Sequence, residues 1–120
     1  MPDSPAQFEI SSKAVDGTRV VKVAGELDLE THEKVAEHLV REAQEGALVV
    51  DLSACEFIDS SGIRALLLGM QAAGGEDDPS RFALAGPSPQ VLRILEMTGL
   101  DTTVQVHSSL DEALAALGRG

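Results

Sequence analysis

The sequence predicts a single α/β domain with a mixed sheet of four or five strands and about four helices. Its 120 residues are the size of one ordinary domain, and 43% of them are hydrophobic, which is enough for a core. From residue 47 onward, strand-like runs alternate with segments of helical periodicity, as in a parallel sheet with crossover helices. A hairpin-like segment precedes this alternation, so the sheet should also contain an antiparallel pair.

The first segments predict the hairpin. Residues 1–7 are expected to form a flexible tail, followed by one domain at residues 8–117. Residues 8–10 alternate like a short strand, Asp-Gly at residues 16–17 signals a turn, and residues 18–23 predict the return strand. A Gly-Glu-Leu-Asp sequence then ends that strand.

The middle of the chain predicts two helices around one buried strand. Apolar residues on one face indicate a helix over residues 29–43, with Gly46 as its C-terminal glycine. Residues 47–52 are apolar except for Asp51, which is typical of a strand covered on both faces. Residues 53–59 are expected to be a connection. A second helix should run from Ser60 or Ser61 to about residue 73, because it carries an amphipathic stripe: Ile63, Leu66, Leu67, Met70 and Ala73.

The last third of the chain continues the same alternation. Strands are expected at residues 82–85 and 103–106. The helix between them should be capped by Ser88, which precedes a proline at the first helical position. A final helix begins at Ser108 or Ser109, and the latter has a glutamate at the spacing of a capping box.

Charge and composition exclude several classes of function. Twenty acidic residues against nine basic ones give a net charge of −11, which argues against nucleic acid or an anionic membrane as a partner. The longest apolar stretch, residues 63–70, is too short to span a bilayer and contains Arg64, so no membrane insertion is expected. The N-terminus lacks the apolar segment of a signal peptide, and the single cysteine excludes an internal disulfide. We therefore expect a cytoplasmic protein.

The candidate site is the Asp-Ser-Ser-Gly sequence at residues 59–62. It places the hydroxyls of Ser60 and Ser61 at a predicted helix N-terminus, where free N–H groups and the helix dipole favour negative charge. Two interpretations are open: Asp59 and the serines only cap the helix, or Ser60 accepts a phosphate. For the four residues alone, capping is the more frequent role.

Other chemistries have less support in the sequence. A hydrolase nucleophile at Ser60 would need glycine two residues earlier, where Ile58 stands, and no glycine-rich loop ending in lysine is present. We therefore expect no enzyme activity and no cofactor. The acidic residues around His32 suit the start of a helix better than a metal site. Cys55 has no cationic neighbour in sequence and is expected to be a buried, inert thiol.

Residues 49–63, Val-Val-Asp-Leu-Ser-Ala-Cys-Glu-Phe-Ile-Asp-Ser-Ser-Gly-Ile, resemble the signature of STAS domains, and more closely that of the bacterial anti-sigma factor antagonists. The Gly-Glu-Leu-Asp sequence at residues 25–28 resembles a second family motif. The resemblance covers nearly the whole chain and implies a regulator without catalytic activity. In this family the unphosphorylated antagonist binds an anti-sigma factor that is also a serine kinase, and so frees a sigma factor for transcription in partner switching, often in a stress response.

The resemblance also implies the site residues. Ser60 would be phosphorylated by the kinase with ATP and reset by a PP2C-type phosphatase. The expected partner surface takes some residues from the matching motifs and adds neighbours by position: Asp28, Asp59, Ser61, Gly62, Ile63 and Arg64. Of these, Ile63 is also a candidate for the core.

Two alternatives differ in class from this switch. One is a STAS scaffold subunit of a stress-sensing assembly, and the other is an accessory subunit of a membrane transport complex. Both would predict a stable complex that does not depend on the phosphorylation of Ser60.

Overall fold

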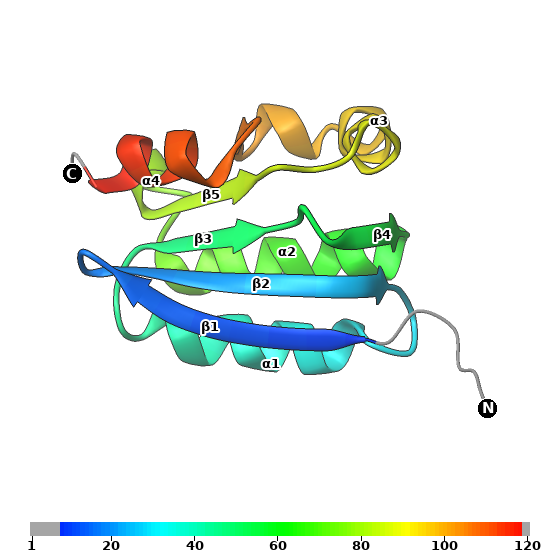
Figure 1. Cartoon of the computed structure of the whole chain (residues 1–120), viewed down its shortest axis with the longest axis horizontal. Coiled ribbons are helices and arrows are strands. Elements are labelled where there is room, and N and C mark those ends of the chain that lie inside the picture. Colours follow the sequence, from blue (N-terminus) through cyan, green and yellow to red (C-terminus); the bar gives the residue numbers. More distant parts are fainter. Residues whose placement is uncertain (1–7, 119–120) are drawn as a thin grey trace.

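A computed structural model describes residues 8–118, so the tail expected at residues 1–7 lies outside the described residues. The central sheet has six strands, with the order β1-β2-β3-β5-β6 and with β4 paired to β2 (Figure 1). Among the described strands, β1 and β2 pair antiparallel, and every other pairing is parallel. The mixed α/β sheet is therefore confirmed, with these strands: Glu9–Val15 (β1), Thr18–Leu27 (β2), Leu48–Asp51 (β3), Cys55–Ile58 (β4), Phe82–Ala85 (β5) and Gln105–His107 (β6).

The hairpin has the expected two-residue turn. Asp16 and Gly17 both have positive φ, 50° and 86°, as a type I′ turn requires. The strand after the turn is longer than the sequence pattern indicates, because β2 continues through the Gly-Glu-Leu motif to Leu27.

The segment at residues 53–59, expected to be a connection, contains β4, and this expectation is wrong. β2 has ten residues and β3 only four, so the second half of β2 extends beyond β3. Its backbone groups would lack partners there. β4 provides them: Gly25 pairs with Cys55 and Leu27 with Ile58, with a register shift between residues 25 and 26.

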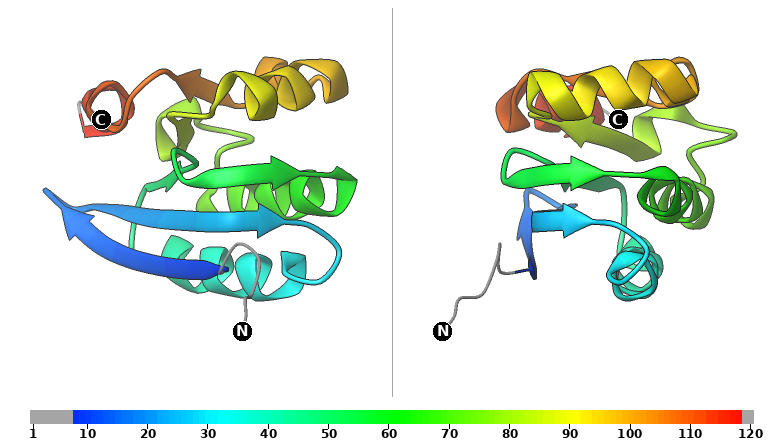
Figure 2. Two further views of the ribbon diagram at one scale, coloured as in Figure 1. Left: turned by 45° about the vertical axis from the view of Figure 1, so that its right-hand side comes forward. Right: turned by 90° about the vertical axis from the view of Figure 1, so that its right-hand side faces the viewer.

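Helices cover both faces of the sheet. α1 (His32–Ala43) and α2 (Ser60–Ala73) lie on one face, α4 (Leu110–Gly118) packs on the other, and α3 (Pro89–Thr98) lies beside β4 (Figures 1 and 2). The larger core lies under α1, α2 and α3. α4 covers a smaller cluster that includes Val20, Val49 and Ala83. Two short 3-10 helices, Pro79–Arg81 and Leu100–Thr102, precede β5 and β6.

Several helix ends follow the sequence signals, and two differ. Ser88 caps α3 by accepting a hydrogen bond from the Val91 N–H at 3.2 Å, and Ser109 accepts one from the Glu112 N–H at 3.1 Å. α1 begins at His32 rather than at residue 29, because a hydrogen-bonded turn occupies the preceding residues. Gly46 does not cap α1, which ends at Ala43 with Gln44 still in right-handed geometry.

Glu42 on α1 ties both strands of the hairpin to the helix layer. Arg19 Nε donates a hydrogen bond to Glu42 Oε1 at 2.7 Å, and Ser12 Oγ donates one to Glu42 Oε2 at 3.1 Å. His38 Nε2 lies 3.9 Å from the same Oε2. The hydrogen bond from Arg19 is the main reason that the pKa of Glu42 lies below its ordinary value.

This depressed pKa predicts an acid-sensitive contribution to stability. It should be fully present above the ordinary pKa of 4.5 and lost as the pH falls through the lower pKa of the folded state. We expect Glu42→Gln to lower the free energy of unfolding by about 1 kcal/mol at neutral pH. Urea unfolding of both proteins over a series of pH values should show this difference shrinking as the pH falls below 4.5 into the acid range where Glu42 becomes protonated in the folded state. A difference that persists there would contradict the prediction.

Candidate partner-binding surface

The two motifs that the sequence analysis singles out meet at one end of the sheet. β2 and β4 end side by side, and the Asp59 N–H donates a hydrogen bond to the Leu27 carbonyl at 3.3 Å. The loop at residues 28–31 and the start of α2 therefore leave the sheet at the same end (Figure 1). We call this region the end face and define it as residues 28–31, Phe57, residues 59–61 and Met97. Asp28, Asp59 and Ser60 all lie on it.

Asp59 is the N-cap of α2. Its backbone is extended, with φ −124°, and its Oδ1 accepts hydrogen bonds from the N–H groups of Ser61 at 2.9 Å and Gly62 at 3.1 Å. Two amides that the helix leaves unpaired are thereby satisfied. The capping interpretation is therefore correct for Asp59, and it leaves a phosphate-accepting role for Ser60 open.

This cap predicts a stability effect. Asp59→Ala removes the acceptor of both amides and should lower the free energy of unfolding by about 1–2 kcal/mol. Asp59→Asn keeps an oxygen at the same place and should lose less. Chemical denaturation of the two variants beside the wild type measures this order. An alanine variant as stable as the wild type would show that water replaces the cap without cost.

The two serines differ in accessibility. Ser60 is exposed at the first position of α2, while Ser61 is only partly exposed. Ser60 comes directly before Ser61 and Gly62, whose N–H groups donate to Asp59, and it lies at the positive end of a 14-residue helix. A phosphate on its hydroxyl would point into solvent and would be favoured by the helix dipole.

Gly62 and Ile63, which the sequence places at or beside the partner surface, are both buried. Ile63 is 8% exposed and belongs to the large core. A Cβ atom on Gly62 would lie 2.5 Å from the Leu27 carbonyl oxygen and 2.7 Å from Ile58 Cγ1. These two residues pack the start of α2 against the sheet, whereas Arg64, the next residue along α2, is exposed.

Asp28 closes a tight turn between β2 and α1. Its Oδ1 accepts hydrogen bonds from the N–H groups of Glu30 at 3.0 Å and Thr31 at 3.3 Å. The Thr31 hydroxyl donates to the Glu26 carbonyl at 2.8 Å and accepts from the Asp28 N–H at 3.0 Å. The loop is therefore held by side chains of its own two ends, and Leu29 at its tip is 72% exposed.

Cys55 lies beneath this surface. Its side chain is buried, and its Sγ donates a hydrogen bond to the Phe57 carbonyl at 3.3 Å. Burial raises the pKa of the thiol, which keeps it protonated and unreactive. The expectation of a buried thiol is confirmed.

Sequence reasoning missed two exposed apolar residues of this region, Phe57 and Leu29. Phe57 is 42% exposed on β4, and its position required knowledge of that strand. Leu29 was expected at the start of a helix. The available signal for its loop was Thr31, three residues after Asp28, since hydroxyl and carboxylate side chains often close turns onto the backbone.

Neither a membrane span nor a metal site is found in the described part of the chain. No helix within residues 8–118 is long and apolar enough to cross a bilayer. Over the same residues, no three His, Cys, Asp or Glu side chains are grouped so that they could hold a metal ion.

The fold and the site match one family of known proteins. Residues 9–113 match the family model described as the STAS domain, and the chain belongs to this family. It is 32% identical to the anti-sigma-B factor antagonist of Staphylococcus aureus, over 87% of this chain and 96% of that protein. It is 28% identical to the anti-sigma-F factor antagonist RsfB of Mycobacterium tuberculosis, over 98% of this chain and 95% of that protein.

A solved structure agrees with these relatives. The crystal structure of an anti-sigma factor antagonist from Mycobacterium paratuberculosis is 32% identical, with a TM-score of 0.83. The match covers 93% of this chain and 95% of that one. The STAS fold expected from the sequence is therefore confirmed.

Proposed function

We propose that this protein is an anti-sigma factor antagonist that acts in the cytoplasm without catalysing a reaction. It binds an anti-sigma factor that is also a serine kinase, and this binding releases a sigma factor. The observation that carries the proposal is the exposed Ser60 at the start of α2, directly after the Asp59 cap. Relatives named anti-sigma factor antagonists support it.

Phosphorylation of Ser60 switches the protein off. The kinase transfers phosphate from ATP to the Ser60 hydroxyl, and a PP2C-type phosphatase removes it. A phosphoserine adds a charge near −2. The N-terminus of α2 tolerates this charge, so the fold persists while the end face changes.

Ser60 is preferred over Ser61 for two reasons. A kinase needs access to the hydroxyl, and Ser60 is exposed while Ser61 is partly covered. The Ser61 N–H is also held by Asp59 at 2.9 Å, so presenting Ser61 to a kinase would disturb the cap.

The proposal is tested by phosphorylation with purified components. The protein is incubated with ATP and with each kinase of the anti-sigma factor type from its own genome, and phosphate is located by mass spectrometry. We expect modification of the wild type and of Ser61→Ala at residue 60, and none of Ser60→Ala. Addition of a PP2C-type phosphatase should remove the phosphate. No modification by any such kinase, or modification that persists in Ser60→Ala, would refute the switch.

A further inference from the structure

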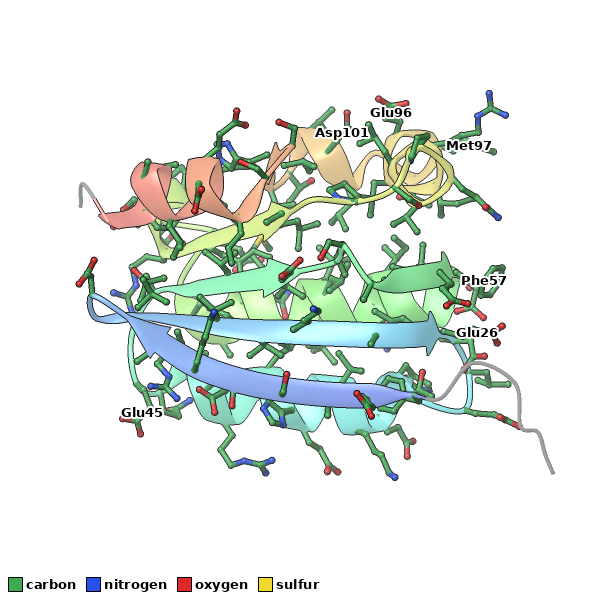
Figure 3. The ribbon with its side chains drawn as sticks, viewed as in Figure 1. Glu26, Glu45, Phe57, Glu96, Met97 and Asp101 are labelled. Carbon is green, nitrogen blue, oxygen red and sulfur yellow. The ribbon has the colours of Figure 1, made fainter. Side chains whose placement is uncertain are left out.

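Large apolar side chains are concentrated on the end face. The described surface exposes five of them, and three lie at this end: Leu29 at 72%, Phe57 at 42% and Met97 at 74%. Figure 3 shows Phe57 on β4 and Met97 on α3 at the end of the molecule where β2 also ends. The other two, Val40 and Leu68, lie on α1 and α2. Single exposed apolar residues are ordinary, but several at one site mark an interaction surface.

Leu29 is presented on a preorganised loop. Four hydrogen bonds among Glu26, Asp28, Glu30 and Thr31, at 2.8 to 3.3 Å, fix the backbone on both sides of it. A side chain on a fixed loop loses less conformational entropy when it is buried by a partner. Holding an apolar side chain in solvent in this way does not stabilise the free protein, which points to a role in binding.

Acidic side chains surround these apolar residues. Glu26 on β2 is exposed and pairs with Phe57 of β4, and Glu30 and Glu56 are exposed next to Leu29 and Phe57 in the chain. Figure 3 shows Glu26 near Phe57, and Glu96, also exposed, beside Met97. The exposed basic residues on the neighbouring helices include Lys34 on α1, Arg64 on α2 and Arg93 on α3. The apolar centre thus has a mainly acidic rim, and a complementary surface would be apolar with a rim of Lys or Arg.

We propose that Leu29 and Phe57 are the apolar anchors by which the end face docks on its protein partner, and that Asp28 is a positioning residue that acts through Leu29. The partner surface is an apolar patch bordered by Lys or Arg. This inference rests on the proposed function, because it takes the partner to be the anti-sigma factor kinase that phosphorylates Ser60. In this view the Asp28 carboxylate fixes the backbone of the loop at residues 28–31 and does not contact the partner.

The anchors are tested by serine substitutions. Leu29→Ser and Phe57→Ser should each weaken binding to the kinase by about tenfold or more, as truncation of a buried anchor does. The matched control is Leu68→Ser, because Leu68 is also 42% exposed but lies about two turns along α2. It should bind within about twofold of the wild type. Wild-type affinity in both anchor variants would overturn the inference.

The positioning role of Asp28 is tested by two variants that separate its charge from its hydrogen bonds. Asp28→Asn keeps the Oδ1 acceptor and loses the charge, whereas Asp28→Ala loses both. Asp28→Asn should bind within about threefold of the wild type, and Asp28→Ala should bind as weakly as Leu29→Ser. Circular dichroism and thermal unfolding show whether each variant is folded. A folded Asp28→Asn as weak as Asp28→Ala would mean that the carboxylate contacts the partner and would overturn the positioning role.

The outcomes separate this inference from the proposed function. If the wild type is phosphorylated at Ser60 and both anchor variants bind the kinase with wild-type affinity, the proposed function stands and the anchor role of Leu29 and Phe57 is refuted. Wild-type protein that binds no such kinase refutes both. Self-association of the wild type that Leu29→Ser abolishes, without an effect on kinase binding, would assign the end face to a second copy of the chain and also refute the inference.

Discussion

Phosphorylation of Ser60 is expected to weaken binding to the anti-sigma factor by about 100-fold or more, which corresponds to about 2.7 kcal/mol. In the free protein the phosphate is hydrated and stabilised by the N-terminus of α2 by about 0.3–1 kcal/mol. Docking would strip its water beside the apolar contacts of Leu29 and Phe57. The loss therefore comes from desolvation and steric exclusion, because the end face is already acidic and suits a basic partner.

Isothermal titration calorimetry with phosphorylated and unphosphorylated protein measures this loss. Ser60→Asp should reproduce most of it, and Ser60→Ala should bind like the unphosphorylated wild type. An acidic residue suits the first turn of α2, so Ser60→Asp should unfold within about 1 kcal/mol of the wild type. Full binding by a folded Ser60→Asp variant would contradict the switch.

Gly62→Ala is expected to destabilise the protein by about 3 kcal/mol. The added Cβ would meet the Leu27 carbonyl oxygen at 2.5 Å and Ile58 Cγ1 at 2.7 Å. The carbonyl is part of the backbone and accepts the Asp59 N–H, so it cannot move away without loosening the start of α2. Urea unfolding of the variant should show a lower midpoint with little change in the denaturant dependence.

A second glycine provides the control for this substitution. No atom lies within 4 Å of a Cβ built on Gly118, which is in α4. Gly118→Ala should therefore leave stability unchanged or raise it by up to about 1 kcal/mol through helix propensity. A Gly62→Ala variant that behaves like Gly118→Ala would show that the end of β2 adapts to the added methyl group.

Local signals in the sequence predict much of this fold. The Asp16–Gly17 turn, the apolar stripe of α2 and the Ser88 cap each depend on residues close together in the chain, and all three are confirmed. β4 was missed because its strand conformation depends on pairing with the second half of β2, which lies about 30 residues away in the sequence. α1 starts later than predicted because the Asp28 and Thr31 side chains bond to the backbone and compete with the helix.

For the candidate site as well, some features follow from local sequence signals and others depend on distant elements. The position of Ser60 at a helix start follows from the cap sequence beside it. Whether Leu29 and Phe57 are exposed depends on how distant elements cover them, and periodicity carries no such information. Gly62 is a further case, because its contact with the Leu27 carbonyl exists only once β2 and α2 are assembled.

The strand β4 has a dynamic consequence. Among the described strands it is hydrogen-bonded to β2 alone, whereas β3 is held between β2 and β5. A register shift beside Gly25 also interrupts the pairing of β4 with β2. Residues 55–58 and the start of α2 should therefore open as a local unit, with amide hydrogen exchange faster than in β3. Such opening would deliver the Ser60 hydroxyl into a kinase active site while the rest of the sheet stays folded.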